Sequence, residues 1–370
     1  MNTANTGINN SSSMFQSLAR LGWTEHFQKH FELLSNDNTA PARVVGVRRN
    51  RFNVSRGEKV WMATVSGRLI HHVNDLYPVT GDWVLLSDTV ITRVLPRKNV
   101  LSRGAAGSAG TNNGLPTREQ MIAANIDTVF IVCGLDRDFN LRRIERYLTL
   151  VYNCGLNPVI VLTKEDLCPE SEQFAEKVES VAYGVPLHLV SVLDDNGLTC
   201  LEQYLSHGQT VTMIGSSGAG KSTLVNRLSG KEVQVTATVS ESVGKGRHTT
   251  TTRDLIMMPQ GGMIIDNPGI REIAFYDDDG GIDIAFPDIE ELARECKFSD
   301  CSHMHEPGCR VIHAATSGEI TPGRLESYRK MKRELAYLYQ RRHKSADRVE
   351  KERWKGIALK IKAINKRKNR

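Results

Sequence analysis

The segment 215–222, which reads GSSGAGKS, has the composition and position of a loop that binds phosphate groups. It matches the pattern GxxxxGK[ST] and lies between an apolar segment (210–216) and a segment of helical spacing (221–229). Glycines let such a loop curl so that its N–H groups face phosphates, and the helix that follows adds the positive end of its dipole. We expect Lys221 to bridge the β- and γ-phosphates of a nucleotide and the Ser222 hydroxyl to bind Mg²⁺. The alternative is a plain glycine-rich turn between a strand and a helix.

A second set of polar residues could select the base of that nucleotide. Thr163, Lys164, Glu165 and Asp166 end an apolar segment and resemble the [NT]KxD element with which GTPases recognise guanine. An Asp carboxylate can accept both the N1–H and the N2–H₂ donors of guanine, whereas adenine offers no such pair. The Lys164 stem would lie along the base or brace the phosphate loop. Ser191 ends the next apolar segment and would lie beside the guanine oxygen, although a surface charge cluster is the alternative for these residues.

The segments after the phosphate loop could hold Mg²⁺ and the γ-phosphate. Asp266–Gly269 fits the pattern DxxG, in which Asp266 would hold Mg²⁺ through a water and the Gly269 N–H would contact the γ-phosphate. The threonine-rich segment 246–252 could supply a second hydroxyl ligand, which we assign to Thr250. Small GTPases place a Gln after DxxG to orient the attacking water, but Ile270 stands there in this chain. We therefore expect slow intrinsic hydrolysis, with His248 as the residue that orients the water; the alternative is that this histidine contacts RNA.

These elements occur in an unusual order along the chain. The guanine element (163–166) precedes the phosphate loop (215–222), which precedes the segments 246–252 and 266–269. Ordinary GTPases begin with the phosphate loop and finish with the base element, so the order indicates a circular permutation. All these motifs are loops at strand ends on one rim of a parallel sheet, and such a sheet tolerates a change in where the chain is cut.

The segments that must position these loops alternate between apolar strands and helices, which indicates a buried, mostly parallel α/β sheet. We expect strands at 128–134, 157–163, 186–192, 210–216, 254–259 and 262–268. We expect helices at 141–153, 171–183, 197–206, 221–229 and 289–296.

The N-terminal part has a different pattern. Residues 14–34 have one or two short stretches of helical spacing. From residue 42, five short β segments separated by Gly, Asn and Asp fit a small closed barrel of the oligonucleotide-binding kind, and a spacer barrel is the alternative. The Gly/Ser/Asn-rich stretch that follows, 104–116, is typical of a linker.

Three cysteines and a histidine near the C-terminus have the spacing of a metal site. Cys296, Cys301, His303 and Cys309 supply three thiolates and an imidazole, the set that fills a closed tetrahedral Zn²⁺ site. Such a site has a structural function because it leaves no open position. His305 competes with His303 for the fourth place, and unrelated reduced thiols are the alternative.

The charge of the chain is divided unevenly. The 370 residues carry a net +6, but residues 326–370 contain 17 Lys and Arg against 5 Asp and Glu. The remainder is mildly acidic, so the basic end needs a partner, and RNA phosphate is the natural one. A solvated helix face and an anionic membrane surface are the alternatives. The chain lacks an apolar run long enough to span a membrane and a secretory signal, and scattered thiols suit a reducing cytoplasm.

Together these stretches resemble the RsgA (YjeQ) family of circularly permuted GTPases that depend on the small ribosomal subunit. The resemblance rests on GDWV (81–84), AANIDTVFIV (123–132), LTKED (162–166), GSSGAGKSTL (215–224), GRHTTTT (246–252), DNPGIRE (266–272) and the cysteine cluster. The family's CxH…EPGC pattern favours His303 over His305 as the zinc ligand. In the family the loop histidine, here His248, is proposed as catalytic. Asn267 stands where the family usually has Thr or Ser.

The resemblance implies a multidomain chain: an OB-fold β-barrel, a circularly permuted α/β P-loop GTPase domain and a zinc-binding α-helical module. We expect disorder at 1–13, a helical segment at 14–40, the OB-fold RNA-binding domain at 41–103, the linker at 104–116, the G domain at 117–285, the zinc-binding domain at 286–345 and the basic tail at 346–370. The expected GTP ligands are Thr163, Lys164, Glu165, Asp166, Ser191, Gly215, Ser216, Ser217, Gly218, Ala219, Gly220, Lys221, Ser222, Thr223, Asp266 and Gly269. The expected Mg²⁺ ligands are Ser222, Thr250 and Asp266.

The implied function is a GTP hydrolase that binds the small ribosomal subunit and its rRNA late in assembly. GTP would favour the bound state, and hydrolysis to GDP and phosphate, stimulated by the ribosome, would release it. We expect a cytoplasmic monomer with one structural Zn²⁺ and with Mg²⁺ bound beside GTP, and no membrane partner. Two alternatives stay open: an RNA-binding, GTP-dependent switch with no direct assembly role, and an ATP-using P-loop enzyme, against which Asp166 argues. A paralogue with a shifted role also stays open.

Overall fold

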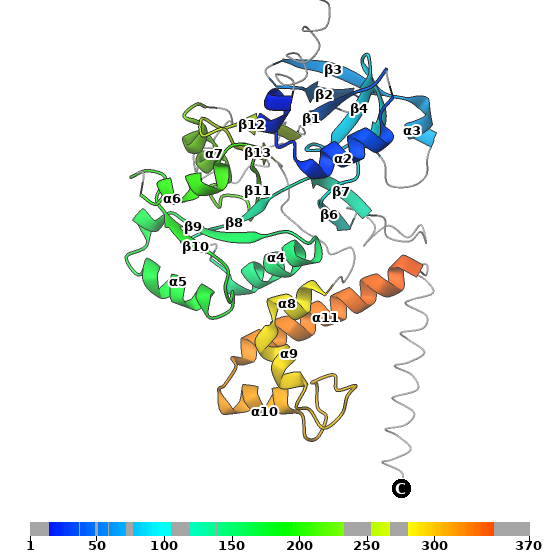
Figure 1. The fold of residues 1–370 in the computed structure, drawn as a ribbon. Coiled ribbons are helices and arrows are strands. Elements are labelled where there is room, and N and C mark those ends of the chain that lie inside the picture. The colour runs from blue at the N-terminus through cyan, green and yellow to red at the C-terminus, as the bar shows by residue number, and fades with distance from the viewer. Residues whose placement is uncertain are drawn as a thin grey trace, which may run out of the picture. The chain divides into compact units, whose positions relative to one another are not determined.

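The structure is a computed structural model that describes residues 15–36, 38–48, 51–57, 59–71, 77–104, 119–137, 139–194, 196–232, 253–266 and 280–343. The chain divides into two compact units, one of Met1–Leu101 with Met121–Glu272 and one of Ser102–Gln120 with Ile273–Arg370 (Figure 1). The expected disordered N-terminus (1–13), nearly all of the expected linker and the basic tail (346–370) lie outside the described residues. Of the helices that are described, none has the length and apolar character needed to cross a membrane.

The α/β part of the first unit is a sheet of five parallel strands and one antiparallel strand. The strands are β8 (Thr128–Gly134), β9 (Pro158–Thr163), β10 (Leu187–Val190), β11 (Thr210–Ile214), β12 (Arg253–Met257) and β13 (Met263–Asp266). Their spatial order is β10-β9-β8-β11-β13-β12, and only β12 runs antiparallel to its neighbour β13 in this series. β9 and β11 are buried at every position, as expected for central strands covered on both faces.

The strand order explains how a rotated set of motifs forms one site. β8, β9 and β10 follow one another along the chain and extend the sheet in one direction. The later strands β11, β13 and β12, named in their spatial order, extend it in the opposite direction. The reversal lies between β8 and β11. Ligands of open α/β sheets bind outside the carboxyl ends of the strands at such a reversal, so the loops after β8, β9, β10, β11 and β13 meet at one edge.

Helices connect these strands close to where their spacing predicts them. They are α4 (Leu141–Asn153), the short η1 (Glu165–Leu167), α5 (Ser171–Glu179), α6 (Thr199–Glu202), η2 (Gln203–Leu205) and α7 (Lys221–Ser229). The helix expected at 171–183 ends at Glu179, and the turn after it closes on the left-handed Gly184. The helix expected at 197–206 is one α-turn followed by a tighter 3₁₀ turn. Apolar side chains from these helices and strands form one core that includes Phe130, Val161 and Leu224.

The barrel lies at the other end of the same unit. Its strands are β1 (Ala40–Arg48), β2 (Arg51–Ser55), β3 (Val60–Val65), β4 (Trp83–Ser87) and β5 (Val90–Val94), with the short helix α3 (Gly67–His71) between β3 and β4. The pairing β1-β2-β3-β5-β4 closes through a β4–β1 ladder, and only β3 and β5 pair in parallel. This closed five-stranded arrangement around a core that includes Phe52, Val84 and Ile91 confirms the predicted OB-like barrel.

The barrel and the α/β sheet are continuous. β1 pairs antiparallel with β12, so all eleven strands share one hydrogen-bonded sheet. The Arg43 guanidinium, almost wholly buried, donates to the carbonyls of Leu21, Gly81 and Asn125, which belong to the N-terminal segment, the barrel and the α/β part. Burial lowers the pKa of Arg43 to about 10, which still leaves it charged near neutrality. Arg43 therefore connects the N-terminal segment, the barrel and the α/β part through its hydrogen bonds.

The N-terminal segment is helical at 15–20 and again in α2 (Glu25–Leu34). Trp23 lies between them, and its ring packs edge-on against Trp83 of the barrel with 4.7 Å between ring centroids. Phe27 of α2 is buried beside the same Trp83 ring. The aromatic residues that predicted helical spacing in the sequence thus cover one end of the barrel.

The second unit is helical around a cysteine-rich loop. It contains α8 (Gly281–Ala285), α9 (Pro287–Ala293), α10 (Arg310–Ser317) and the long α11 (Pro322–His343). Arg324 of α11 forms a bidentate ion pair with Asp288 of α9, with N–O distances of 2.6 and 2.7 Å. A two-stranded sheet of β6 (Val100–Gly104) and β7 (Glu119–Ala124), which the sequence did not predict, flanks residues 105–118.

Candidate functional site

The phosphate loop has the backbone that its glycines predict. Gly215 follows β11 with a φ of 151°, and a Cβ there would lie 2.2 Å from the Val132 carbonyl oxygen. Gly218 and Gly220 also have positive φ, and Gly220 is the N-cap of α7. The Lys221 ammonium folds back over the loop and donates to the carbonyls of Gly215, at 2.8 Å, and Ser216. The loop therefore presents its lysine and the N-terminus of α7 on one side.

The guanine element contacts the phosphate loop directly. The Thr163 hydroxyl donates to the Ala219 carbonyl at 2.7 Å, although the two residues are 56 positions apart. A Cβ at Gly220 would lie in ordinary contact with the same hydroxyl, at 3.4 Å, so the left-handed φ of 89° and not a lack of space favours glycine there. Lys164 has a left-handed φ of 64°, and its ammonium pairs with Asp136, two residues beyond β8. The two motifs, remote in sequence, form one continuous surface.

Asp166 and Ser191 meet where the strand order predicts. The Ser191 hydroxyl, in a residue only 2% exposed, donates to Asp166 Oδ1 at 2.9 Å, and Asp194 Oδ2 lies 3.2 Å from the same oxygen. A hydroxyl has one hydrogen, so we assign the donated bond to the shorter contact, while the Asp194 N–H donates to the hydroxyl at 3.3 Å. Asp166 itself is exposed, so its remaining lone pairs are accessible.

A second contact fixes the same two loops. The Asn196 side-chain amide donates to Glu165 Oε2 at 2.8 Å, and the Asn196 backbone carbonyl accepts the Ser191 N–H at 3.1 Å. Sequence reasoning missed Asn196, Asp194 and Asp136. All three follow the ends of parallel strands at this edge, which is the signal that could have identified them.

Asp266 ends β13, the strand next to β11, so it lies at the same edge as the phosphate loop. Ser216 and Ser222 are half-buried, whereas Ser217, Gly218 and Thr223 are exposed. His248, Thr250 and Gly269 lie outside the described residues, so their places in the site stay predictions. The described part of the edge combines a phosphate cradle, a lysine, a hydroxyl, a carboxylate suited to Mg²⁺ and a second carboxylate suited to guanine.

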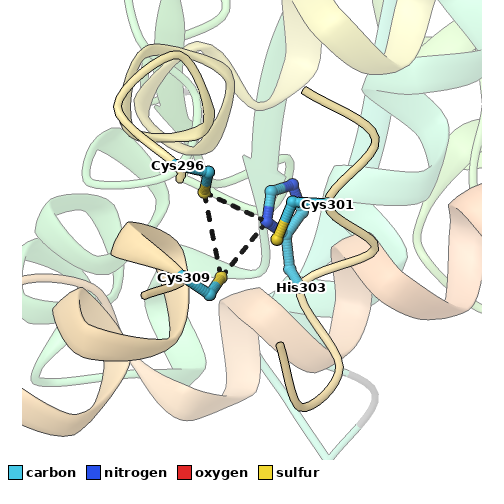
Figure 2. A group of neighbouring side chains, drawn as sticks. All are labelled: Cys296, Cys301, His303 and Cys309. Carbon is cyan, nitrogen blue, oxygen red and sulfur yellow. Dashed lines mark hydrogen bonds between the residues drawn. The ribbon is translucent and has the colours of Figure 1, made fainter. Parts of the chain in front are cut away.

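The second unit contains a compact Cys₃His cluster (Figure 2). Cys296 follows α9, Cys301 and His303 come from the loop between the helices, and Cys309 caps α10, accepting from the Ile312 N–H. The four ligand atoms all lie within 4.8 Å of one another. Cys296 Sγ lies 3.6 Å from His303 Nδ1 and 3.9 Å from Cys309 Sγ, and the last two atoms are 3.4 Å apart.

These distances fit a tetrahedral metal. With Zn–S at about 2.3 Å and Zn–N at about 2.0–2.1 Å, neighbouring ligand atoms lie about 3.5–3.8 Å apart. Burial lowers the pKa of His303, which favours the neutral imidazole that a metal needs. Desolvation, together with the neighbouring Cys309 and Cys296 thiols, raises the pKa of Cys301 to about 11, and a bound cation would lower it. The cluster is therefore suited to hold a metal ion.

The structure also places the two candidate histidines, His303 and His305, in different environments. His303 is buried in the cluster, with a left-handed φ of 53°, and its carbonyl accepts from Arg329 of α11. His305 is exposed and contributes its backbone N–H to Glu306 Oε2 at 3.1 Å. The Glu306 carboxylate also accepts from Ser302 and Met304, and these hydrogen bonds hold its pKa far below the usual range. This network shapes the loop that brings Cys301 and His303 to the cluster.

Comparisons with known proteins agree with this geometry. The family model described as RsgA GTPase matches residues 94–276. A protein named small ribosomal subunit biogenesis GTPase RsgA, from Syntrophotalea carbinolica, is 42% identical over 326 residues, which cover 86% of this chain and 90% of the relative. A protein of the same name from Methanosarcina acetivorans is 45% identical over 295 residues and 78% of each chain.

Two solved structures share the fold. The crystal structure of YjeQ from Thermotoga maritima superposes with a TM-score of 0.57 at 28% identity, over 80% of this chain and 99% of that one. The structure of YloQ, described as a circularly permuted GTPase, gives a TM-score of 0.54 over 82% of this chain and 97% of that one, and at 21% identity it shows the fold alone.

Proposed function

The chain belongs to the RsgA GTPase family, and from that premise we propose that it binds the small ribosomal subunit and assists its late maturation. It hydrolyses GTP to GDP and phosphate, the bound subunit stimulates turnover, and hydrolysis drives release. One observation carries the nucleotide assignment: Thr163 contacts Ala219 of the phosphate loop while Asp166 contacts Ser191. A guanine-selective carboxylate is thereby attached to a phosphate cradle, although the motifs occur in rotated order.

The nucleotide is held by this chain's own donors. The residues proposed to bind GTP are Thr163, Lys164, Glu165, Asp166, Ser191, Gly215, Ser216, Ser217, Gly218, Ala219, Gly220, Lys221, Ser222, Thr223, Asp266 and Gly269. Phosphate oxygens would replace the carbonyls of Gly215 and Ser216 as partners of the Lys221 ammonium. Mg²⁺, which neutralises charge between the phosphates, would be held by Ser222, Thr250 and, through a water, Asp266.

Hydrolysis depends on a group outside the usual position. Ile270 cannot orient a water, so intrinsic turnover is slow. His248 takes this role once a docked subunit places the segment 246–252 against the γ-phosphate. A neutral imidazole can orient a water without a shifted pKa.

The Cys₃His cluster holds one Zn²⁺ through Cys296, Cys301, His303 and Cys309. Because the four ligands close the coordination sphere, this zinc stabilises the loop between α9 and α10 and takes no part in the reaction. A loop of this length cannot bury a core of its own, so a metal is an efficient way to fix it.

RNA binding follows from charge and from the barrel. α11 exposes basic residues such as Lys330 and Arg333, and the strongly basic residues 344–370 continue beyond it. Such clusters bind phosphate backbones, and the OB-like barrel is a fold that commonly binds oligonucleotides. We propose rRNA of the small subunit as the partner of both, with the protein acting as a monomer in the cytoplasm.

The decisive experiment measures GTP turnover alone, with purified small subunits and with large subunits as the control. Stimulation by small subunits only is expected, and no stimulation would refute the assembly role in favour of an RNA-binding switch. Co-sedimentation with small subunits under a non-hydrolysable GTP analogue, GDP and no nucleotide, over a salt series, tests the switch. If binding to small subunits is the same with every nucleotide and is lost at modest salt, only the basic tail binds.

A further inference from the structure

The boundary between the barrel and the α/β sheet contains an ion pair that the nucleotide motifs do not account for. Arg48, the last residue of β1, is bidentate to Asp254 of β12, with Nη1–Oδ1 at 2.8 Å and Nη2–Oδ2 at 2.5 Å. Both side chains are partly exposed, at 40% and 37%. A bidentate fork between Arg and a carboxylate fixes the orientation of both groups as well as their distance.

The strand register places this pair in line with the Mg²⁺ site. Gly46 of β1 is the direct cross-strand partner of Asp254, and Asp254 is the direct partner of Asp266 in β13. The register brings Gly46 close to this carboxylate: a Cβ at Gly46 would lie 2.5 Å from Asp254 Oδ1, so a larger residue there would displace the carboxylate. Gly46, Asp254 and Asp266 thus form one row across three adjacent strands, from the barrel to the carboxylate proposed to hold Mg²⁺.

Two neighbouring residues of this row, Asp254 and Asp266, carry like charges, and Arg48 offsets one of them. Directly opposed residues of an antiparallel pair project from the same face, with Cβ atoms about 4.5–5.5 Å apart, and like charges there are destabilising. Asp254 and Asp266 are such a pair. Arg48 lies two residues beyond Gly46, hence on the same face of β1, and its guanidinium offsets the Asp254 charge.

We propose that Arg48 is a positioning residue for the GTPase centre, acting through Asp254 to hold the start of β12 and the carboxylate of Asp266 in place for Mg²⁺. β12 begins at Arg253, so the anchor acts on the second residue of that strand. The barrel thereby contributes to the metal geometry of the nucleotide site. This inference rests on the proposed function, because it takes Asp266 as a Mg²⁺ residue.

The test is a Mg²⁺ titration of single-turnover GTP hydrolysis by the full chain. In Arg48→Ala the half-saturating Mg²⁺ concentration should rise about fivefold, the upper range for a partly exposed ion pair. Asp254→Asn should give a smaller rise, since it removes the anchor together with the repulsion. The double variant should match Asp254→Asn, because without Asp254 the arginine has no partner through which to act. Arg48→Lys, which keeps the charge but loses the fork, should lie between the wild type and Arg48→Ala.

The matched control is Arg51→Ala, which removes an exposed arginine paired with Arg48 in the β1–β2 register. It should leave the Mg²⁺ midpoint unchanged. GTP affinity in EDTA and the melting temperature should be the same in all these variants, which separates positioning from general destabilisation. An Arg48→Ala midpoint equal to that of the wild type, an equal shift in Arg51→Ala, or additive shifts in the double variant would overturn the proposal.

One further variant separates the inference from its premise. Asp266→Asn should raise the half-saturating Mg²⁺ concentration by more than Arg48→Ala does. If it does not, the assignment of Asp266 fails and the proposed site is wrong. If it does and Arg48→Ala has no effect, only the inference about Arg48 fails.

Discussion

The base specificity of the nucleotide site should depend on one carboxylate, Asp166. One of its lone pairs already accepts the Ser191 hydroxyl at 2.9 Å, and a carboxylate offers about four acceptor sites in all. Two donors of guanine can therefore be accommodated on the exposed side chain. Hydrogen bonds to a charged group contribute about 1.5–3 kcal/mol each, and solvent exposure reduces the pair to about 3 kcal/mol together.

Asp166→Asn should accordingly weaken GTP binding by about 100-fold, since every 1.4 kcal/mol is about tenfold in affinity. The new amide N–H₂ would face the donors of guanine, so the loss includes an unfavourable contact. Xanthine carries a carbonyl where guanine carries its amino group, so the variant should gain affinity for xanthosine triphosphate. Equilibrium binding of GTP and xanthosine triphosphate measures both effects, with ATP as the control.

Asp194→Asn is the matched control, because Asp194 approaches the same Ser191 hydroxyl at 3.2 Å. Its expected effect is a few-fold at most, the range of one neutral hydrogen bond. Unchanged GTP affinity in Asp166→Asn, or an equal loss in Asp194→Asn, would refute the assignment. In the second case the shape of the loop, and not the carboxylate of Asp166, would select the base.

Three further predictions concern the metal, the barrel and the reaction. His303→Ala should lose the bound zinc that atomic absorption detects at about one ion per chain, whereas His305→Ala should retain it; equal retention would exclude His303 as a ligand. Arg97→Ala should cost about 3–5 kcal/mol in denaturant unfolding, because Asp82, fully buried and 2.7 Å from Arg97 Nε, would lose its ion partner; a loss below about 1 kcal/mol would contradict this. His248→Ala should slow subunit-stimulated turnover about 100-fold with GTP affinity intact, and an unchanged rate would transfer the role to another group.

Much of the α/β part could be predicted because its signals are local. The apolar segments that form β8, β9 and β11 and the glycines of the phosphate loop encode backbone conformation within a few residues. Element ends were less predictable: α5 stops at Glu179, short of the expected 183. The pair β6–β7 was missed because 14 residues separate its two strands, far more than the short loop by which a hairpin is recognised in a sequence.

The sequence by itself determined the residue types and short spacings on which the proposed chemistry depends: a phosphate-loop pattern, a candidate guanine carboxylate, a Cys₃His set and a basic end. Only the tertiary structure decided which of these residues lie in contact with one another. Spacing allowed either His303 or His305 and the family pattern favoured His303; in the structure it is the buried His303 that lies among the three cysteines. The Arg48–Asp254 pair joins residues 206 positions apart, and such contacts depend on strand register, which no local pattern encodes.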